Sequence, residues 1–183
     1  MRIVTGNCKG KTLKIPKSKY VRPTRTMVRE AIFSVLGDFV EGKEVLDLFS
    51  GSGVLGFEAL SNAARSVIFV EKNKLPLRVI RENMLHLGFS SECRVIGRDV
   101  FTAFNILRKK NLRFHIVFAD PPYSLGLAKK CLLNIGNCDI LLPSSIIVIE
   151  HYKKDELPEH TDKLKLWQLK KYGDTFVSFY VPV

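Results

Sequence analysis

The chain has 183 residues, of which 46% are hydrophobic, so it carries enough apolar material for one sizeable core and is not a disordered polypeptide. Its apolar runs fall short of the roughly 20 residues that cross a bilayer, and the N-terminal MRIVTGNCKGK lacks the apolar stretch of a secretion signal. The net charge is +11, and residues 1–29 hold nine Lys or Arg and no acid. The other 154 residues therefore carry only 11 − 9 = +2, and a cationic end on an otherwise nearly neutral chain indicates a polyanion-binding surface.

The four cysteines form no CxxC pair, and the four histidines show no metal-ligand spacing. We therefore expect reduced thiols in a cytoplasmic protein, with neither a disulfide nor a metal ion.

The basic N-terminal end begins with two short β-prone runs, 2–5 and 11–15, which flank the glycine-containing GNCKG and predict a small hairpin. The following RPTRTMVREAIFSVLG predicts a helix with apolar residues on one face. Thr24 or Thr26 is expected to cap this helix, and Gly37 to end it.

From residue 44 onward, short apolar strands alternate with helices, which is typical of a parallel sheet covered by helices on both faces. We expect strands at 45–49, 66–71, 93–97, 115–120 and 145–150, and helices at 54–63, 76–88, 100–110 and 127–136. Two further strand-like runs, 163–172 and 175–183, are joined by Gly-Asp and predict a terminal antiparallel pair. The expected fold class is α/β in a single domain, 1–183, with a basic appendage at 1–40 and a ligand-binding core at 41–183.

The stretch DLFSGSGVLG joins the first of these strands to its helix, and Gly51, Gly53 and Gly56 follow the pattern G-x-G-x-x-G. Glycines there let the backbone turn sharply and approach a ligand near the positive end of a helix. Glu71 ends the second strand, 20 residues after Gly51, where a carboxylate accepts the two hydroxyls of a ribose. The pattern predicts an adenosine-containing ligand; for the glycines, a tight turn without ligand is the alternative.

Two adenosine ligands compete for this loop. NAD would place its pyrophosphate over the glycines, where the carboxylate of Asp47 repels it. S-adenosylmethionine would place its amino-acid end there, and its ammonium group suits Asp47. Asp99 follows the third strand, where it either holds an adenine amino group or caps the next helix, and its two oxygens allow both.

A second stretch, FHIVFADPPYSLG, ends an apolar strand on Asp120, two prolines and Tyr123. The prolines fix two φ angles and remove two backbone donors, so the loop presents acceptors and an aromatic ring. Because ligands lie beyond the carboxyl ends of parallel strands, we expect Asp120 to face the same crevice as Gly51. The alternative is a strand-ending turn with a solvated acid and a packed tyrosine.

The motifs DLFSGSGVLGFEAL, VEKN at Glu71, GRDVF and FADPPY resemble class I S-adenosylmethionine-dependent methyltransferases that modify exocyclic amino groups. The N-terminal RIVTGNCKGKTLKIP and RPTRTMVREAIFSVL extend the likeness over nearly the whole chain, which resembles the bacterial 16S rRNA (guanine-N2)-methyltransferases. The resemblance implies a Rossmann-like, seven-stranded, mostly parallel sheet whose last strand is inserted antiparallel. It also implies small-subunit rRNA, or the assembling small subunit, as the partner. Separately from the resemblance, we expect a monomer.

The resemblance also implies roles for individual residues. The exocyclic amine of a base is a poor nucleophile, because its lone pair is delocalised into the ring. Asp120 and the carbonyl of Pro121 would accept from this amine, and Tyr123 would stack on the splayed-out base, a contact worth roughly 1–3 kcal/mol. The expected S-adenosylmethionine contacts are Asp47, Ser50, Gly51, Gly53, Glu71, Asp99 and Val100, and the expected RNA contacts in the basic end are Arg2, Lys9, Lys11, Arg22 and Arg25.

Other functions share some of these features. Adenine-N6 methyltransferases of DNA and methyltransferases of protein glutamine carry a similar tetrad, but the former usually add a recognition domain and the latter more often begin it with Asn. An NAD-dependent reductase would need a Tyr with a Lys three or four residues later, and Tyr152 in YKK lacks that spacing. A non-catalytic RNA-binding module would have no use for the Asp120–Tyr123 tetrad. Binding of S-adenosylmethionine separates the methyltransferases from the last two classes.

Overall fold

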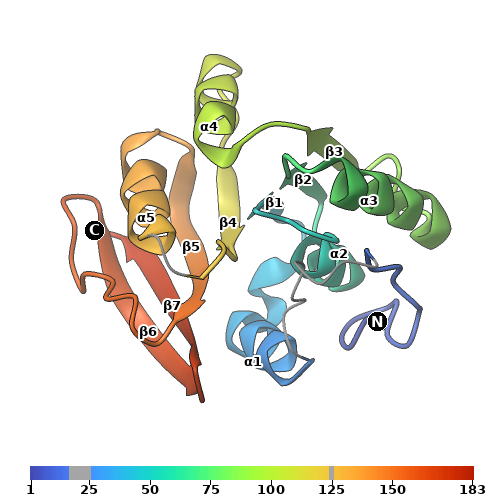
Figure 1. The fold of residues 1–183 in the computed structure, drawn as a ribbon, viewed down its shortest axis with the longest axis horizontal. Helices are drawn as coiled ribbons and strands as arrows, with labels where there is room; N and C mark the ends of the chain where they lie inside the picture. The colour runs from blue at the N-terminus through green and yellow to red at the C-terminus, as the bar shows by residue number, and fades with distance from the viewer. Residues whose placement is uncertain (17–25, 124–125) are drawn as a thin grey trace.

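The computed structural model describes residues 1–16, 26–123 and 126–183. Within these residues, seven strands form one sheet in the order β3-β2-β1-β4-β5-β7-β6 (Figure 1). The strands are β1 (Glu44–Leu48), β2 (Ser66–Val70), β3 (Cys93–Ile96), β4 (Phe114–Ala119), β5 (Leu141–Tyr152), β6 (Leu164–Tyr172) and β7 (Thr175–Pro182). The helices are α1 (Thr26–Leu36), the 3-10 helix η1 (Gly37–Val40), α2 (Val54–Ser61), α3 (Lys74–Leu87), α4 (Val100–Lys109) and α5 (Leu127–Asn137).

The direction of the strands confirms the predicted sheet. The pairs β1–β2, β1–β4, β2–β3 and β4–β5 are parallel. Strand β7 lies between β5 and β6 and runs antiparallel to both, so the last strand of the chain is inserted into the sheet. Strand β1 is central and packs against helices on both faces, so Val45, Leu46 and Leu48 are buried, and its two charged residues are Glu44 at its start and the buried Asp47.

Helices cover both faces of the sheet, as expected. Apolar residues of α1, α2 and α3 pack against one face in a cluster that includes Phe57, Phe69, Phe118 and Val148. Apolar residues of α4 and α5 pack against the other face. Two cores of this kind bury β1, β2, β4 and β5 on both sides, which fixes the positions of the loops that follow these strands.

The main differences from the predicted boundaries lie at β5 and at the N-terminus. Strand β5 begins at Leu141 because Phe114 pairs with Leu141, and an irregularity follows before Ile116 pairs with Ile146. The N-terminal hairpin is held by one bridge, Arg2 to Thr12, with backbone hydrogen bonds on either side, and has no regular strands. Helix α1 ends at Leu36 before the left-handed Gly37, as predicted, whereas Thr24 lies outside the described residues.

The N-terminal residues are fastened to α2 by a buried charge. Glu58, fully buried in α2, accepts from the backbone N–H groups of Val4 and Thr5 and from the guanidinium of Arg29 at 2.6 Å. Burial lowers the pKa of Arg29, although the neighbouring Glu58 carboxylate opposes this change. At Gly6 (φ +72°) a Cβ would lie 2.0 Å from a backbone oxygen of α2, so a side chain there would displace the loop. The hairpin therefore has a fixed position relative to the helix that follows the glycine loop.

Two features are absent from the residues that the structure describes. None of the helices there is long and apolar enough to span a membrane. The same ranges contain no group of three or more His, Cys, Asp or Glu side chains arranged to hold a metal ion.

Candidate active site

The site lies where the chain changes direction across the sheet. From β1 the chain moves outward through β2 and β3, then returns to β4 on the other side of β1 and continues to β5. In open α/β sheets, ligands bind at such a point, beyond the carboxyl ends of the strands. A cavity of about 440 Å³ opens there, lined by the residues that follow β1, β2, β3 and β4 and by Glu150 of β5. This volume lies within the range of small-molecule sites.

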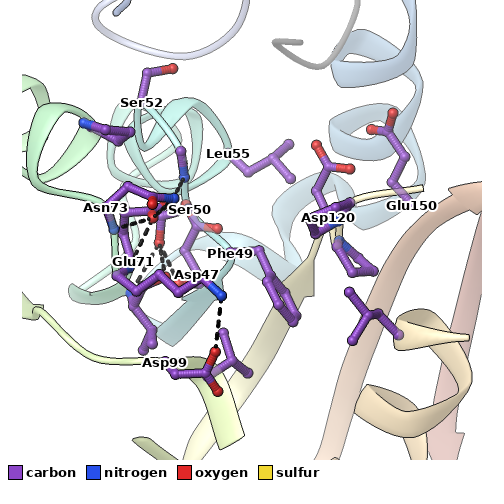
Figure 2. A pocket seen from close by; sticks show the side chains of 18 of the residues that line it. Asp47, Phe49, Ser50, Ser52, Leu55, Glu71, Asn73, Asp99, Asp120 and Glu150 are labelled. Atoms are coloured by element: carbon purple, nitrogen blue, oxygen red, sulfur yellow. Dashed lines mark hydrogen bonds and ion pairs between the residues drawn. The ribbon is translucent and has the colours of Figure 1, made fainter. Parts of the chain in front are cut away.

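Most of the predicted site residues converge on this cavity. The lining includes Asp47, Ser50, Gly51, Glu71, Asp99, Val100, Asp120, Pro121 and Tyr123. Figure 2 shows Glu71 and Asp99 on one side, Asp120 and Glu150 on the other, and Phe49 between them. Among the described lining residues there are five carboxylates, on Asp47, Glu71, Asp99, Asp120 and Glu150, against the cationic Lys72 and Arg98. This balance favours a cationic ligand over a pyrophosphate.

Asp47 is the most deeply placed of these acids. It projects from β1 one residue before the end of the strand, is 3% exposed, and accepts from the N–H of Gly56 at 3.0 Å. Burial raises the pKa of Asp47 to about 7; the Gly56 hydrogen bond opposes this change, and the charge of Glu71 adds to it. A buried acid with a raised pKa would be stabilised as a carboxylate by a cationic group in the cavity.

Glu71 ties the end of β2 to the glycine loop. Its Oε1 accepts from the N–H groups of Lys72 and Asn73 at 2.8 and 2.7 Å and from the Asn73 side-chain amide at 2.9 Å. Its Oε2 accepts from the N–H of Gly51 at 3.0 Å. Oε1 is thus well occupied, and Oε2 is the oxygen with more acceptor capacity toward a ligand hydroxyl. The side-chain amide of Asn73, which donates to Oε1 and lines the cavity, is a polar group that sequence reasoning missed.

The glycine loop leaves β1 through an unusual backbone. Phe49 has φ +55°, which is uncommon for an aromatic residue, and Gly51 has φ +54°. The hydroxyl of Ser50 donates to the Asp47 carbonyl and accepts from the N–H of Val70, so it joins the ends of β1 and β2. This geometry turns the backbone toward the cavity immediately after β1.

Gly53 is a predicted cofactor contact that is not among the lining residues. It has φ +78°, and a Cβ there would lie 2.8 Å from Phe57 and 3.0 Å from Phe69. At Gly56, a Cβ would lie 2.3 Å from the Phe69 ring. These two glycines are therefore explained by the turn and by the aromatic pair packed beneath it, whereas Gly51 faces the cavity.

Asp99 caps a helix, and this confirms one of its two predicted roles. Its Oδ1 accepts from the N–H of Phe101 at the start of α4, and its Oδ2 lies 3.3 Å from the Lys72 ammonium. The adjacent Val100 is buried and lines the cavity. An adenine amino group would meet Oδ2 once the exposed Lys72 side chain turned aside.

The Asp-Pro-Pro-Tyr tetrad follows β4 at the other side of the cavity. Asp120 is half-buried and Pro121 buried. The Tyr123 hydroxyl donates to Glu150 Oε1 at 3.1 Å and lies 2.8 Å from the hydroxyl of Thr175, while its ring is 5.8 Å from that of Tyr152. Burial raises the pKa of Tyr123 to about 12, so this tyrosine is a neutral phenol at physiological pH. The expectation of a packed tyrosine and that of a pocket tyrosine both fit this placement.

Glu150 is another site residue that sequence reasoning missed. It lies near the end of β5, is 6% exposed, and lines the cavity beside the tetrad. The available signal was an acid at the end of the apolar run SIIVI.

The predicted RNA contacts that the structure describes are not among the residues that line the cavity. Arg2, Lys9 and Lys11 are exposed on the N-terminal hairpin, which is fastened to α2. Arg22 and Arg25 lie outside the described residues.

An open parallel sheet with a ligand cavity at its switch point and an inserted antiparallel last strand is the Rossmann-like fold of methyltransferases. The chain belongs to the family described as "conserved hypothetical protein 95", whose model matches residues 1–181.

Curated relatives and solved structures agree with this assignment. The chain is 34% identical to the ribosomal RNA small subunit methyltransferase D of Haemophilus influenzae over 98% of this chain and 91% of that protein. It is 29% identical to the protein of the same name in Escherichia coli strain K12, over 98% and 89% of the two chains. A hypothetical protein of Thermus thermophilus superposes with a TM-score of 0.85 at 28% identity, covering 100% and 99% of the two chains. A more distant structure, with 19% identity and a TM-score of 0.70, covers 86% of this chain and 48% of its own; it was solved with S-adenosylhomocysteine, and its likeness to this chain is one of fold.

Proposed function

We propose that this protein is an S-adenosylmethionine-dependent methyltransferase that acts on small-subunit rRNA and methylates the exocyclic N2 amine of a guanine. The observation that carries the proposal is that Asp120, at the end of β4, lines the same cavity as Asp47 and Glu71 at the ends of β1 and β2. Methyltransferases of small-subunit rRNA among the relatives support the same substrate class.

The polar and charged groups that line the cavity fit S-adenosylmethionine. The buried Asp47 suits an ammonium group, Glu71 Oε2 and the Asn73 amide suit ribose hydroxyls, and Asp99 suits an adenine amino group. Phe49 and Val100 supply apolar contacts for the adenine ring. When bound, this ligand supplies an electrophilic methyl group on a sulfonium.

The tetrad prepares the amine for attack. The Asp120 carboxylate and the Pro121 carbonyl accept its two N–H groups, which holds the nitrogen and directs its lone pair toward the methyl carbon. With the cofactor bound, this alignment would let the nitrogen take the methyl group, while the electron pair of the carbon–sulfur bond would stay on sulfur. The nitrogen then loses its extra proton to Asp120 or water. The rate gain comes from alignment in a site that excludes water, and Tyr123 presents a ring face to the base.

The basic surface is assigned to the RNA backbone. Arg2, Lys9 and Lys11 of the hairpin, together with Arg22 and Arg25, contact phosphates while one base enters the cavity. Because the hairpin is fixed to α2 through Glu58, phosphate contacts there set the position of the RNA relative to the glycine loop.

The test is methyl transfer to small ribosomal particles that lack the modification, followed by digestion and mass spectrometry of the nucleosides. We expect one N2-methylguanosine for each particle. Asp120→Ala should lower the single-turnover rate by at least a hundredfold and leave S-adenosylmethionine binding unchanged, whereas Asp120→Asn, which keeps an acceptor oxygen, should retain part of the activity. A product other than N2-methylguanosine, or Asp120→Ala reacting at the parent rate, would overturn the assignment.

A further inference from the structure

We propose that Glu150 reads the target base, by accepting a hydrogen bond from guanine N1–H while Asp120 accepts from the neighbouring N2 amine. The inference rests on the proposed function and adds to it a residue that selects guanine against the other bases.

Strand register places the two carboxylates side by side. Ala119 of β4 pairs with Ile149 of β5, so Asp120 and Glu150 each follow a paired residue by one position on adjacent parallel strands. Neighbouring strands lie about 5 Å apart. Phe118 and its partner Val148 face the α1–α3 side of the sheet. Side chains alternate along a strand, so Asp120 and Glu150 lie on that same side, and in Figure 2 their carboxylates point in the same direction.

Glu150 is buried, lines the cavity and is held by a hydrogen bond. The residue is 6% exposed and lines the same cavity as Asp120. Its Oε1 accepts from the Tyr123 hydroxyl at 3.1 Å, and that hydroxyl lies 2.8 Å from Thr175 Oγ1. Burial raises the pKa of Tyr123, the Thr175 hydrogen bond opposes this change, and the charges of Glu150 and Asp120 add to it, so both acids lie near the Tyr123 hydroxyl.

Two adjacent carboxylates match the edge of guanine. Guanine presents N1–H and the N2 amine next to each other, and both are donors. Adenine and cytosine present an exocyclic amine next to a ring nitrogen that is an acceptor, and a carboxylate in that position repels an acceptor. A flipped base is read by hydrogen bonds along this edge. The pair Asp120 and Glu150 therefore accepts guanine and disfavours adenine, which separates this site from that of an adenine-N6 methyltransferase.

A second role for Glu150 would be to hold Tyr123 in place, and substitutions distinguish the two. Glu150→Gln keeps an oxygen that accepts from the Tyr123 hydroxyl but replaces the other with an NH₂ donor. Tyr123→Phe removes the hydroxyl and leaves Glu150 intact. If Glu150 reads N1–H, Glu150→Gln should slow single-turnover methylation of undermethylated particles by roughly ten- to a hundredfold. The double variant should then show the product of the two separate losses.

A more specific test of the contact to N1–H changes the target base instead of the enzyme. The target guanine of a reconstituted particle is replaced by 2,6-diaminopurine, which keeps the 2-amino group but has an acceptor at N1. The parent enzyme should methylate this particle at least tenfold more slowly than the guanine particle, and Glu150→Gln, with a donor facing N1, should narrow or reverse that preference. Calorimetry with S-adenosylmethionine alone should give parent affinity for each variant.

The outcomes separate this inference from the proposed function. If the parent enzyme forms no N2-methylguanosine on the guanine particle, the proposed function fails. If the parent enzyme does form it, but methylates the 2,6-diaminopurine particle equally fast, the role proposed for Glu150 is wrong and the proposed function stands. This comparison uses the parent enzyme alone, so it does not depend on whether a variant folds. A Glu150→Gln enzyme at the parent rate, or a double variant no slower than Tyr123→Phe, would likewise assign Glu150 to support of the tyrosine.

Discussion

The buried carboxyl of Asp47 should make cofactor binding depend on pH. With a pKa near 7 in the ligand-free protein, Asp47 is mostly protonated below neutrality. Binding of an ammonium group beside it requires the carboxylate, so binding releases a proton there. The charged fraction rises from about 3% at pH 5.5 to about 50% at pH 7, so the affinity for S-adenosylmethionine should rise about 15-fold over this interval. The α-amino group of the ligand, with an ordinary pKa of about 8, stays protonated throughout.

Isothermal calorimetry in two buffers of different ionisation enthalpy tests this expectation. Near pH 6 about 0.9 proton should be released for each ligand bound. Asp47→Asn keeps an acceptor for the Gly56 N–H but has no proton to lose, so its affinity should be weaker at pH 7 and flat with pH. An affinity of the parent protein that varies less than twofold between pH 5.5 and 7, without proton release, would refute the placement of the ammonium at Asp47.

The same group predicts the pH dependence of stability. The pKa of Asp47 is raised on folding from 3.8 to about 7, so the folded protein binds more protons than the unfolded chain between these values. Its contribution is fully present below about pH 4 and is lost as pH rises through 7, by at most about 4 kcal/mol. Three other expectations concern separate parts of the molecule. Glu71→Ala removes the acceptor of four hydrogen bonds and should weaken S-adenosylmethionine binding at least tenfold in calorimetry and lower the melting temperature; unchanged affinity in a folded variant would contradict the ribose assignment. Replacing Lys9 and Lys11 with Ala should reduce the log–log salt slope of RNA binding by about 0.7 to 0.9 for each lost phosphate contact, whereas Lys109→Ala, an exposed control on α4, should leave it unchanged. Arg29→Met leaves its buried carboxylate partner uncompensated and should cost about 3–5 kcal/mol in urea unfolding; a loss below 1 kcal/mol would show that the pair contributes little.

The parts of the site that could be predicted from the sequence are those fixed by local pattern and by one topological rule. Gly51, Glu71 and Asp120 each end or follow an apolar strand, and the carboxyl ends of parallel strands meet at one edge of a sheet. That rule brings residues 20 to 70 positions apart into one cavity without any knowledge of side-chain packing. The helix cap at Asp99 could also be predicted, because it depends only on the local sequence, namely the hydrogen bond to a residue two positions later.

The parts that could not be predicted depend on register and on what packs beneath a loop. Glu150 lies beside Asp120 because of the pairing of β4 with β5, which includes an irregularity that local periodicity does not reveal. The need for glycine at position 56 comes from Phe69, which belongs to β2, and position 53 is crowded by Phe69 together with Phe57 of α2. The burial of Glu58, in a helix expected only to cover the sheet, depends on the N-terminal loop packed against it.

The cavity is acidic and the N-terminal end is basic, and this difference lets the proposed enzyme treat an RNA base differently from the RNA phosphate backbone. Five carboxylates among the described lining residues repel phosphates, so the potential inside the cavity admits a cationic cofactor and the donor edge of a base. The exposed cations of the hairpin attract phosphates, but they lie outside the cavity on a segment fixed to α2. When an RNA strand is bound at the hairpin, the acidic cavity therefore favours entry of a base over entry of a phosphate, and the phosphates stay outside. Under the proposed function, this arrangement favours base flipping before any contact specific to guanine is made, and Asp120 and Glu150 then select among the bases that enter.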